Sequence, residues 1–400
     1  MRGHVVKRMT KPRDGSRPRA IYYVKVGKLW LTDPATGSGF ARKADAEAHL
    51  VTTVAAMNGG TWVAPSSTLA GEFLSRHLEL QKSRLKASTW ASYDKTLRVY
   101  VLPRIGDIPL QKLTADHLDQ MYIDLLASGG REGKPLTPRT VRYVHVLVKA
   151  ALGTAVDKGL IVRNPADAAT PPATSRASGA PPQTWSAGEV SEFLSRSQEH
   201  WLGGVWAFLA LTGCRRGEAL ALTWPDVDFV AGKATIRASR GRVGSDIITD
   251  TPKSGRIRVI DLDPGLISLL RQVLEKQSED GRVVGPGYRR DGLVFTDALG
   301  EAIHPETVSN AFAREVKRAG LRPIRLHDLR HTWATLALTA GVHPKKVQRQ
   351  LGHAHVSITL AIYSHLTDED GDNAAAMVAD LIGSYGGDNV LPLRKAVDGE

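Results

Sequence analysis

The spacing of hydrophobic positions changes twice along the chain. In the first 64 residues it alternates as in strands: Ile21–Val26 is rich in β-branched and aromatic residues, and Gly27-Lys28 makes a tight turn into Leu29–Thr32. Val5–Met9 predicts another strand. The pattern therefore predicts a small three-stranded sheet, followed by a helix that begins near Lys43. The apolar face of that helix is predicted to consist of Ala44, Ala48, Val51 and Ala55.

Residues 66–168 follow the helical period and predict an all-helical unit. Ser67 or Thr68 is expected to cap its first helix, and Ser88 its second. Thr114 is expected to start the third, and Thr137-Pro138 the fourth, with proline at its favoured first position. The buried face of the third helix is predicted to hold Leu118, Met121, Tyr122 and Leu125.

The stretch 169–184 is rich in proline, serine and alanine, has no apolar period and predicts a linker. Ser186 and Glu189 then form a capping box that opens a new helix. Beyond it, helices flank a strand-rich block at 233–262, whose later strands are joined by a turn at 251–255. The predicted fold class is multidomain α+β. The expected segments are 1–64, 65–170, a linker at 171–184, 185–385 and a tail at 386–400.

The formal charge of +12 and the isoelectric point near 9.7 suit a polyanionic partner such as nucleic acid, although charge also serves solubility. About +7 of this charge lies in the first 65 residues, which favours a binding surface there. Each basic candidate can also be a solvated surface residue. The candidates for DNA contact are Lys7, Arg8, Lys11, Arg13, Arg17, Arg19, Arg139, Arg142 and Lys149.

Several classes of protein are excluded or disfavoured. The single cysteine, Cys214, rules out an internal disulfide and a cysteine-based zinc cluster. The sequence has no apolar run of about eighteen residues and no signal-type stretch at its start, so we expect a cytoplasmic protein without a membrane partner. It also lacks a P-loop, a Rossmann fingerprint and an HExxH motif. We therefore expect no metal and no cofactor.

Arginines instead stand at a predicted turn after an apolar helix. The glycines of Thr212–Glu218 imply a tight turn that would aim Arg215 or Arg216 at a ligand. The nearby carboxylate of Glu218 can orient one guanidinium group. Taken alone, the segment is equally consistent with a pair of solvated arginines at a helix end.

A second group of polar residues lies further along the chain. His327 and Arg330 are three residues apart near a predicted helix start, so they share a face and can both donate to an anionic oxygen. His331 is expected to face elsewhere. His353 follows a helix that begins near Pro344, and Tyr363 lies in a further short helical segment, where a lone tyrosine is usually a core residue.

Together these residues resemble the tyrosine recombinase (phage integrase) family over the whole of 185–385. Cys214 stands where the family more often has leucine or methionine. The hairpin lysine is the least specific match, because its turn varies in length and sequence. The matching positions are the first catalytic arginine at Arg215, the hairpin lysine at Lys253, the His-x-x-Arg motif at His327 and Arg330, the second histidine at His353 and the nucleophile at Tyr363.

The resemblance implies a metal-independent chemistry on DNA. Arg215, Arg330 and His353 would bind the scissile phosphate, and Glu218 would hold an arginine in place. A phosphodiester under attack gains negative charge, which fixed cationic donors stabilise.

The resemblance also assigns the proton transfers. Tyr363 would attack the phosphorus and form a 3′-phosphotyrosyl link, while His327 accepts the phenolic proton. Lys253 would protonate the 5′-oxygen that leaves. Because the bond energy is conserved, no ATP motif is needed.

The other segments resemble the family at lower specificity. The resemblance assigns an arm-type DNA-binding domain to 1–64, a helical SAM-like core-binding domain to 65–170 and a mixed, mainly α-helical catalytic domain of the DNA breaking-rejoining type to 185–385. An apolar helix at 374–382 would dock on a neighbouring subunit or pack on its own domain.

The partners implied are double-stranded DNA attachment sites, a homotetramer on synapsed DNA, an accessory DNA-bending protein and an excisionase. We expect an integrase of a temperate phage or integrative element. The alternatives are a tyrosine-type transposase or plasmid recombinase, a type IB topoisomerase, or a catalytically inactive DNA-binding derivative.

Overall fold

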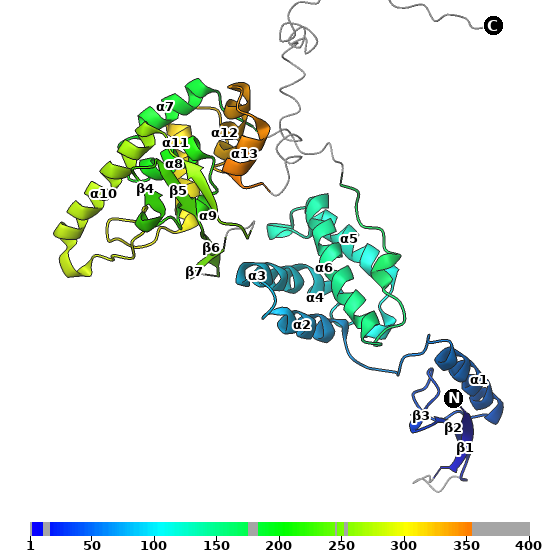
Figure 1. Cartoon of the computed structure of the whole chain (residues 1–400). Coiled ribbons are helices and arrows are strands. Elements are labelled where there is room, and N and C mark those ends of the chain that lie inside the picture. Colours follow the sequence, from blue (N-terminus) through cyan, green and yellow to red (C-terminus); the bar gives the residue numbers. More distant parts are fainter. Residues whose placement is uncertain (1, 11–16, 175–182, 245, 252–254, 354–400) are drawn as a thin grey trace, which may run out of the picture. The chain divides into compact units, whose positions relative to one another are not determined.

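The computed structural model describes residues 2–10, 17–174, 183–244, 246–251 and 255–353 (Figure 1). The chain divides into two compact units, residues 1–176 and 177–400. The finer division, with boundaries near 64, 170 and 184, stays a prediction. Lys11, Arg13, Lys253, Tyr363 and the apolar helix expected at 374–382 lie outside the described residues.

The first unit begins with the predicted three-stranded antiparallel sheet, in the order β1-β2-β3. Gly27 has a left-handed φ of 59° and turns β2 into β3, as its place in the sequence predicts. The register pairs Val5 with Val24, and Val24 with Leu31. The strands are β1 Gly3–Met9, β2 Ala20–Val26 and β3 Leu29–Leu31.

Helix α1 (Lys43–Asn58) covers one face of this sheet, but through a different side of the helix from the one predicted. Its contacts with the sheet core come from Ala46, Leu50, Val54 and Met57. The larger side chains bury more apolar area than alanines do, and they decide which side faces the strands. The predicted face is wrong, because all its members are exposed: Ala44, Ala48, Val51 and Ala55.

The rest of this unit is helical, as predicted. One hydrophobic core is shared by α2, α5 and α6 with the turns between them. The predicted apolar face of α5, from Leu118 to Leu125, is buried. The helices are α2 Ala70–Gln81, α3 Ala87–Thr96, a π-helical turn Leu97–Val101, α4 Leu102–Ile105, α5 Ala115–Ser128 and α6 Pro138–Asp157.

Helix caps follow the sequence at two of the four predicted positions. Thr114 and Thr137 accept hydrogen bonds from the backbone three residues on, at 3.4 and 3.3 Å. Ser67 and Thr68 do not cap α2, whose first turn follows Leu69. Its Leu69 N–H donates to the Glu72 carboxylate instead. Helix α3 begins at Ala87, so Ser88 lies inside it.

The second unit mixes helices with short strands. The Ser186–Glu189 capping box forms as predicted, with Ser186 N–H donating to Glu189 at 2.8 Å. Strands β4, β5 and β8 make one antiparallel sheet, and β6 and β7 make a separate hairpin. The helices are α7 Ala187–Ser197, α8 Gly203–Thr212, α9 Arg216–Ala219, α10 Pro264–Val284, α11 Pro305–Arg318, α12 Asp328–Thr339 and α13 Pro344–Leu351. The strands are β4 Val227–Asp228, β5 Lys233–Ile236, β6 Ser239–Val243, β7 Asp246–Asp250 and β8 Arg258–Asp261.

Helix α8 runs through the core of this unit. It is apolar on all sides, as expected of a helix surrounded by others, and contacts α7, α10 and α12. Trp206 of this helix packs against Phe193 and Phe312, which also contact each other and Trp185, with ring centroids 5.0–6.1 Å apart. This rigid helix carries the turn that follows it. Within the described ranges, no helix is both long enough and apolar enough to cross a bilayer.

Candidate active site

The turn after α8 is built around Gly213, whose left-handed φ of 66° ends the helix. A Cβ at this position would lie 2.6 Å from the side chain of Leu351 and 3.0 Å from Trp333, so only glycine fits. The chain then becomes extended at Arg215 and enters the short helix α9. The packing of α12 and α13 against this glycine brings three distant segments together.

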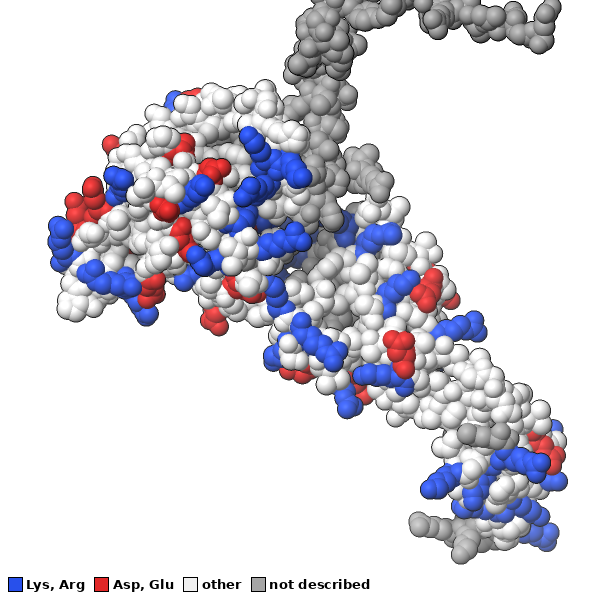
Figure 2. Space-filling model, in the orientation of Figure 1, with Lys and Arg blue, Asp and Glu red and all other residues white. Residues whose placement is uncertain are grey.

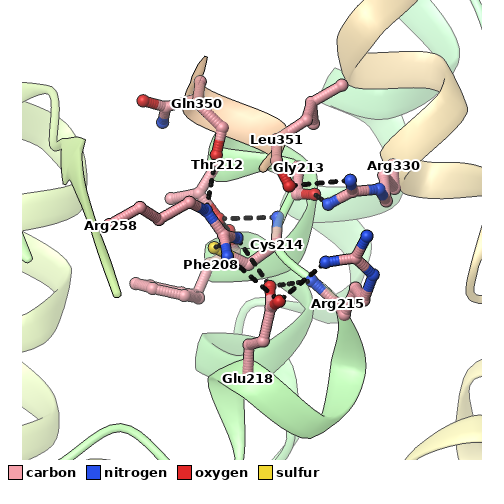
Figure 3. Close-up of polar contacts among 10 residues, drawn as sticks. All are labelled: Phe208, Thr212, Gly213, Cys214, Arg215, Glu218, Arg258, Arg330, Gln350 and Leu351. Carbon is pink, nitrogen blue, oxygen red and sulfur yellow. Dashed lines mark hydrogen bonds and ion pairs between the residues drawn. The ribbon is translucent and has the colours of Figure 1, made fainter. Parts of the chain in front are cut away.

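Glu218 lies on α9, and its side chain is completely buried and bonded to Arg215 and Arg258 (Figure 3). Its carboxylate accepts from the Arg215 guanidinium at 2.9 Å and from the Arg215 backbone N–H at 3.0 Å. It also accepts two hydrogen bonds from Arg258, at 2.6 and 3.0 Å. Burial alone would raise the pKa of Glu218, but the hydrogen bonds and charge of Arg258, with those of Arg215, hold it at about 2. Glu218 is therefore ionised at neutral pH.

Arg330 is only 3% exposed and reaches the same place from α12. Its two terminal nitrogens donate to the backbone carbonyls of Gly213 (2.9 Å) and Leu351 (2.8 Å). Burial, and then the charge of Arg215, lower the pKa of Arg330 to about 10. Among the described residues it forms no ion pair. Two guanidinium groups, those of Arg215 and Arg258, thus pair with the single carboxylate of Glu218, and Arg330 adds a third cation. The site therefore carries an excess of positive charge.

Two histidines face this cationic site. His327 is partly open to solvent. Partial burial of its ring lowers its pKa to about 4, and the nearby charges of His331 and Arg330 act in the same direction. Burial and the charges of Arg330 and Arg215 lower the pKa of His353 to about 4 as well. Both imidazoles are neutral at pH 7 and can donate or accept a proton.

The expectation that His331 faces away from His327 is wrong. The two rings lie edge to face, with centroids 5.4 Å apart. The residues are four apart in sequence, and the His327 ring at the helix start lies over the first turn of α12. His331 is therefore part of the electrostatic surroundings of His327.

The structure brings the predicted residues Arg215, Glu218, Arg330, His327 and His353 into one region. It also adds Arg258 on β8, which we did not select from the sequence. Alternating apolar and basic residues in that strand gave a weak signal, because the pattern cannot show which arginine turns inward. Arg216 points elsewhere and donates to the Ser309 hydroxyl at 2.6 Å.

The basic residues of the N-terminal sheet lie on both of its faces. Arg8 lies over the Trp30 ring at 4.6 Å, and Lys25 lies over the same ring at 5.2 Å, on the face opposite α1. Trp30 is 44% exposed. Lys7 pairs with Tyr22 on the α1 side. Arg17 and Arg19 are exposed beyond the strands, and Figure 2 shows many Lys and Arg side chains on this part of the chain.

The basic residues predicted on α6 differ in how far their charge is neutralised. Arg139 and Arg142 are exposed, and Arg142 donates to the carbonyl of Pro172 at 3.4 Å. Lys149 forms an ion pair with Asp167 at 2.8 Å. Its charge is already partly compensated, so it is the weakest of the three candidates for DNA contact.

Comparisons with known proteins identify the family. The model of the phage integrase family matches residues 187–370, and the model of the phage integrase N-terminal SAM-like domain matches residues 71–126. Together the two matches cover more than half of the chain. This chain belongs to the phage integrase family of tyrosine recombinases. The resemblance predicted from the motifs is thus confirmed, and the chain is a site-specific recombinase by family.

Relatives of this recombinase include integrases. It is 27% identical to a tyrosine recombinase XerC-like protein of Caldanaerobacter subterraneus subsp. tengcongensis, over 76% of this chain and 80% of that protein. It is 26% identical to the putative prophage phiRv2 integrase of Mycobacterium tuberculosis, over 92% of this chain and 94% of the relative. The solved Tn1549 transposon integrase, in complex with a circular intermediate DNA, matches with a TM-score of 0.63. That match has 21% identity and covers 77% of this chain and 99% of the other, and it supports the predicted fold class.

The depressed histidine pKa values predict how stability changes with pH. His327 and His353 titrate near 4 when folded, but near 6.5 when unfolded. Between these values the unfolded recombinase binds more protons, so its free energy of unfolding should fall as the pH is lowered from about 6.5 to about 4. We expect the Tm to drop over this window.

The variant His327→Gln/His353→Gln isolates this contribution. Glutamine does not titrate, so the variant should lose less Tm between pH 7 and pH 5 than the wild type. Calorimetry at matched ionic strength measures both slopes. An unchanged slope would show that the two histidines have ordinary pKa values in the folded protein.

Proposed function

We propose that the chain is a site-specific integrase that cuts and rejoins DNA through a covalent bond to Tyr363. The observation that carries this proposal is the excess of positive charge around Glu218. A buried cation without a counterion is unfavourable, so such a site favours binding of an anion. Arg215 and Arg330 come from different segments and can hold one phosphate between them.

Two arginines suit a phosphodiester under attack. They stay charged at neutral pH, and their planar guanidinium groups can each donate twice to phosphate oxygens. His353 would add a third donor. A donor aimed at developing charge in the transition state contributes about 3–4 kcal/mol. Because Arg330 is fixed by two backbone carbonyls, it needs no reorganisation when the charge develops.

The proton transfers complete the proposed mechanism. The Tyr363 hydroxyl has an ordinary pKa of about 10 and must lose its proton as it attacks. His327, neutral at pH 7, would accept that proton. The bond from phosphorus to the 5′-oxygen breaks as the bond to the tyrosine oxygen forms, and Lys253 would give the leaving oxygen its proton. Attack by a 5′-hydroxyl of the partner strand reverses these steps and releases the enzyme.

The proposed substrate is a pair of double-stranded attachment sites, joined or separated within the cytoplasm of a bacterial host. Two duplexes contain four strands to be cut, so we propose a homotetramer on DNA, with an accessory bending protein and an excisionase. The prophage integrase among the relatives supports the choice of attachment sites, and the DNA complex of the Tn1549 transposon integrase supports DNA as the substrate. A transposase would differ by joining to many target sequences.

A nicked suicide duplex tests the proposal. The sequence of this duplex comes from the repeats that flank the element carrying the gene. A nick just beyond the cut site makes the fragment with the new 5′-hydroxyl short, so it diffuses away and cannot reverse the cleavage. The full-length wild-type protein should become attached to the DNA and survive denaturing gel electrophoresis. A chelator should not reduce the yield, because no step uses a metal. Binding without any adduct would favour the inactive DNA-binding alternative.

Removal of residues 1–64 tests the arm assignment. The exposed Arg8 and the half-buried Lys25 beside Trp30 would be lost, and with them the proposed phosphate contacts that make affinity depend on salt. We expect footprints at distal arm sites to weaken at least tenfold, while the core-site footprint remains. Footprints equal to those of the full chain would exclude an arm-binding role. Trp30→Ala is the milder variant and should act in the same direction.

A further inference from the structure

Arg258 touches more parts of the candidate active site than any residue predicted from the sequence. It lies on β8, and only 8% of its side chain is exposed. Its guanidinium group spans both oxygens of Glu218, the carboxylate that also holds Arg215 (Figure 3). The same group lies 3.7 Å from the sulfur of Cys214, in the turn before Arg215.

The other edge of Arg258 faces the segment that carries His353. Its Nε donates to the backbone carbonyl of Gln350 at 2.9 Å. Gly352 lies directly on the side chain, since a Cβ there would be 3.0 Å from Cδ and 3.2 Å from Nε of Arg258. Gly352 has a left-handed φ of 69°, which ends α13 and turns the chain toward His353. Arg258 therefore fixes where this turn can lie.

These contacts join two sides of the phosphate site that have no strand or helix in common. On one side are Glu218 and Arg215, and on the other is the turn from Gln350 to His353. A lysine is a poor replacement, because its three donors diverge from one nitrogen and cannot span both Glu218 oxygens while also reaching the Gln350 carbonyl at the opposite edge. All three guanidinium nitrogens of Arg258 donate to protein acceptors, and Glu218 already neutralises its charge. Arg330 differs, because among the described residues its Nε donates to no protein acceptor and it forms no ion pair. We therefore assign the phosphate contact to Arg330 and not to Arg258.

We propose that Arg258 is a positioning residue that sets the spacing between Arg215 and His353 around the scissile phosphate. This inference rests on the proposed function, because that function supplies the scissile phosphate. The contacts of Arg258 themselves do not depend on it. A displacement of about 1 Å at a reacting centre can cost about 100-fold in rate. Loss of Arg258 should therefore slow cleavage strongly without removing any group that touches the DNA.

Single-turnover cleavage of the nicked duplex, at saturating full-length protein, tests this role. We expect Arg258→Met to cleave about 100-fold more slowly than the wild type, with its Kd for the same duplex changed less than threefold. Arg258→Lys should recover only part of the loss. If Arg258→Met fails to fold, Arg258→Lys can be measured in its place, because lysine keeps a cation beside Glu218.

Arg237→Met is the control. Arg237 forms an ion pair with Asp226, whose side chain is buried like that of Glu218, although 54% of the Arg237 side chain is exposed. Among the described residues, no hydrogen bond or ion pair links this pair to Arg215, Glu218 or Arg330. This variant should lose stability and keep its cleavage rate. If Arg258→Met cleaves at the same rate as Arg237→Met, the positioning role is wrong, although the proposed function stands. If the wild type forms no covalent adduct at all, the proposed function fails instead.

Double variants separate positioning from general destabilisation. If Arg258 acts through Glu218 and the His353 turn, its loss should be non-additive with theirs. Arg258→Met/Glu218→Gln and Arg258→Met/His353→Ala should each cleave at about the rate of the slower single variant. Losses that multiply in both cases would mean that Arg258 acts independently of both partners and would overturn the proposal.

Discussion

The Tyr363→Phe protein is expected to bind attachment-site DNA as the wild type does, and to form no covalent adduct. Phenylalanine keeps the ring but has no oxygen to attack phosphorus, whereas the proposed contacts of Arg215 and Arg330 with the phosphate do not depend on this oxygen. The adduct should therefore fall below detection, while the Kd measured by gel shift changes less than about twofold. The nicked suicide duplex and a denaturing gel give the first quantity.

The chain offers a control of the same chemistry. Tyr385 lies 22 residues further on, in a segment with no catalytic match, and Tyr385→Phe should leave the adduct intact. An adduct that persists in Tyr363→Phe would exclude Tyr363 as the nucleophile. If Tyr385→Phe removes the adduct instead, the nucleophile has been assigned to the wrong tyrosine.

The second large effect is expected at Arg330. Its replacement by alanine removes a buried cation that faces the proposed phosphate, and a donor of this kind contributes about 10²–10³-fold to the rate of a charged transition state. We expect single-turnover cleavage to fall by about this factor. Affinity for DNA should change little, since many other phosphate contacts remain. Rapid-quench kinetics on the suicide duplex measure the rate.

The structure complicates this variant in one respect. Arg330 also donates to the carbonyls of Gly213 and Leu351, which would lose their partner. Leaving a buried acceptor unpaired costs about 1–3 kcal/mol, so the Tm must be measured beside the rate. Arg318→Ala is the control, because Arg318 is exposed and pairs with Glu315 at the end of α11. Cleavage by folded Arg330→Ala at the rate of Arg318→Ala would remove Arg330 from the site.

Local sequence signals predicted much of the fold. The strand pattern of residues 20–31 and the caps at Thr114, Thr137 and Ser186 act within a few residues, and all of them form as expected. The face of α1 was predicted wrongly because alanines at helical spacing look apolar in sequence. The side that is buried carries the larger Leu50, Val54 and Met57, which pack on the sheet.

The candidate site shows the same limit. The Arg215–Glu218 pair is local, so the sequence could suggest it. Arg258 is 40 residues from Glu218 and 92 from Gln350, and its partners are chosen by how β8 packs against α13. No periodicity encodes such a contact. The prediction that His331 faces away from His327 failed for a related reason. Helical spacing tells which side chains share a face only once the first residue of the helix is known, and His327 lies just before α12.

The two carbonyl contacts of Arg330 bear on how cutting is timed. The backbone on either side already holds this arginine in the DNA-free protein, and Arg215 is held by Glu218. The two arginines proposed to bind the phosphate are thus already held in place before DNA binds. In the proposed mechanism, a safeguard against cutting a lone duplex would therefore act on the position of the Tyr363 phenol, because moving Arg330 away would break its buried contacts.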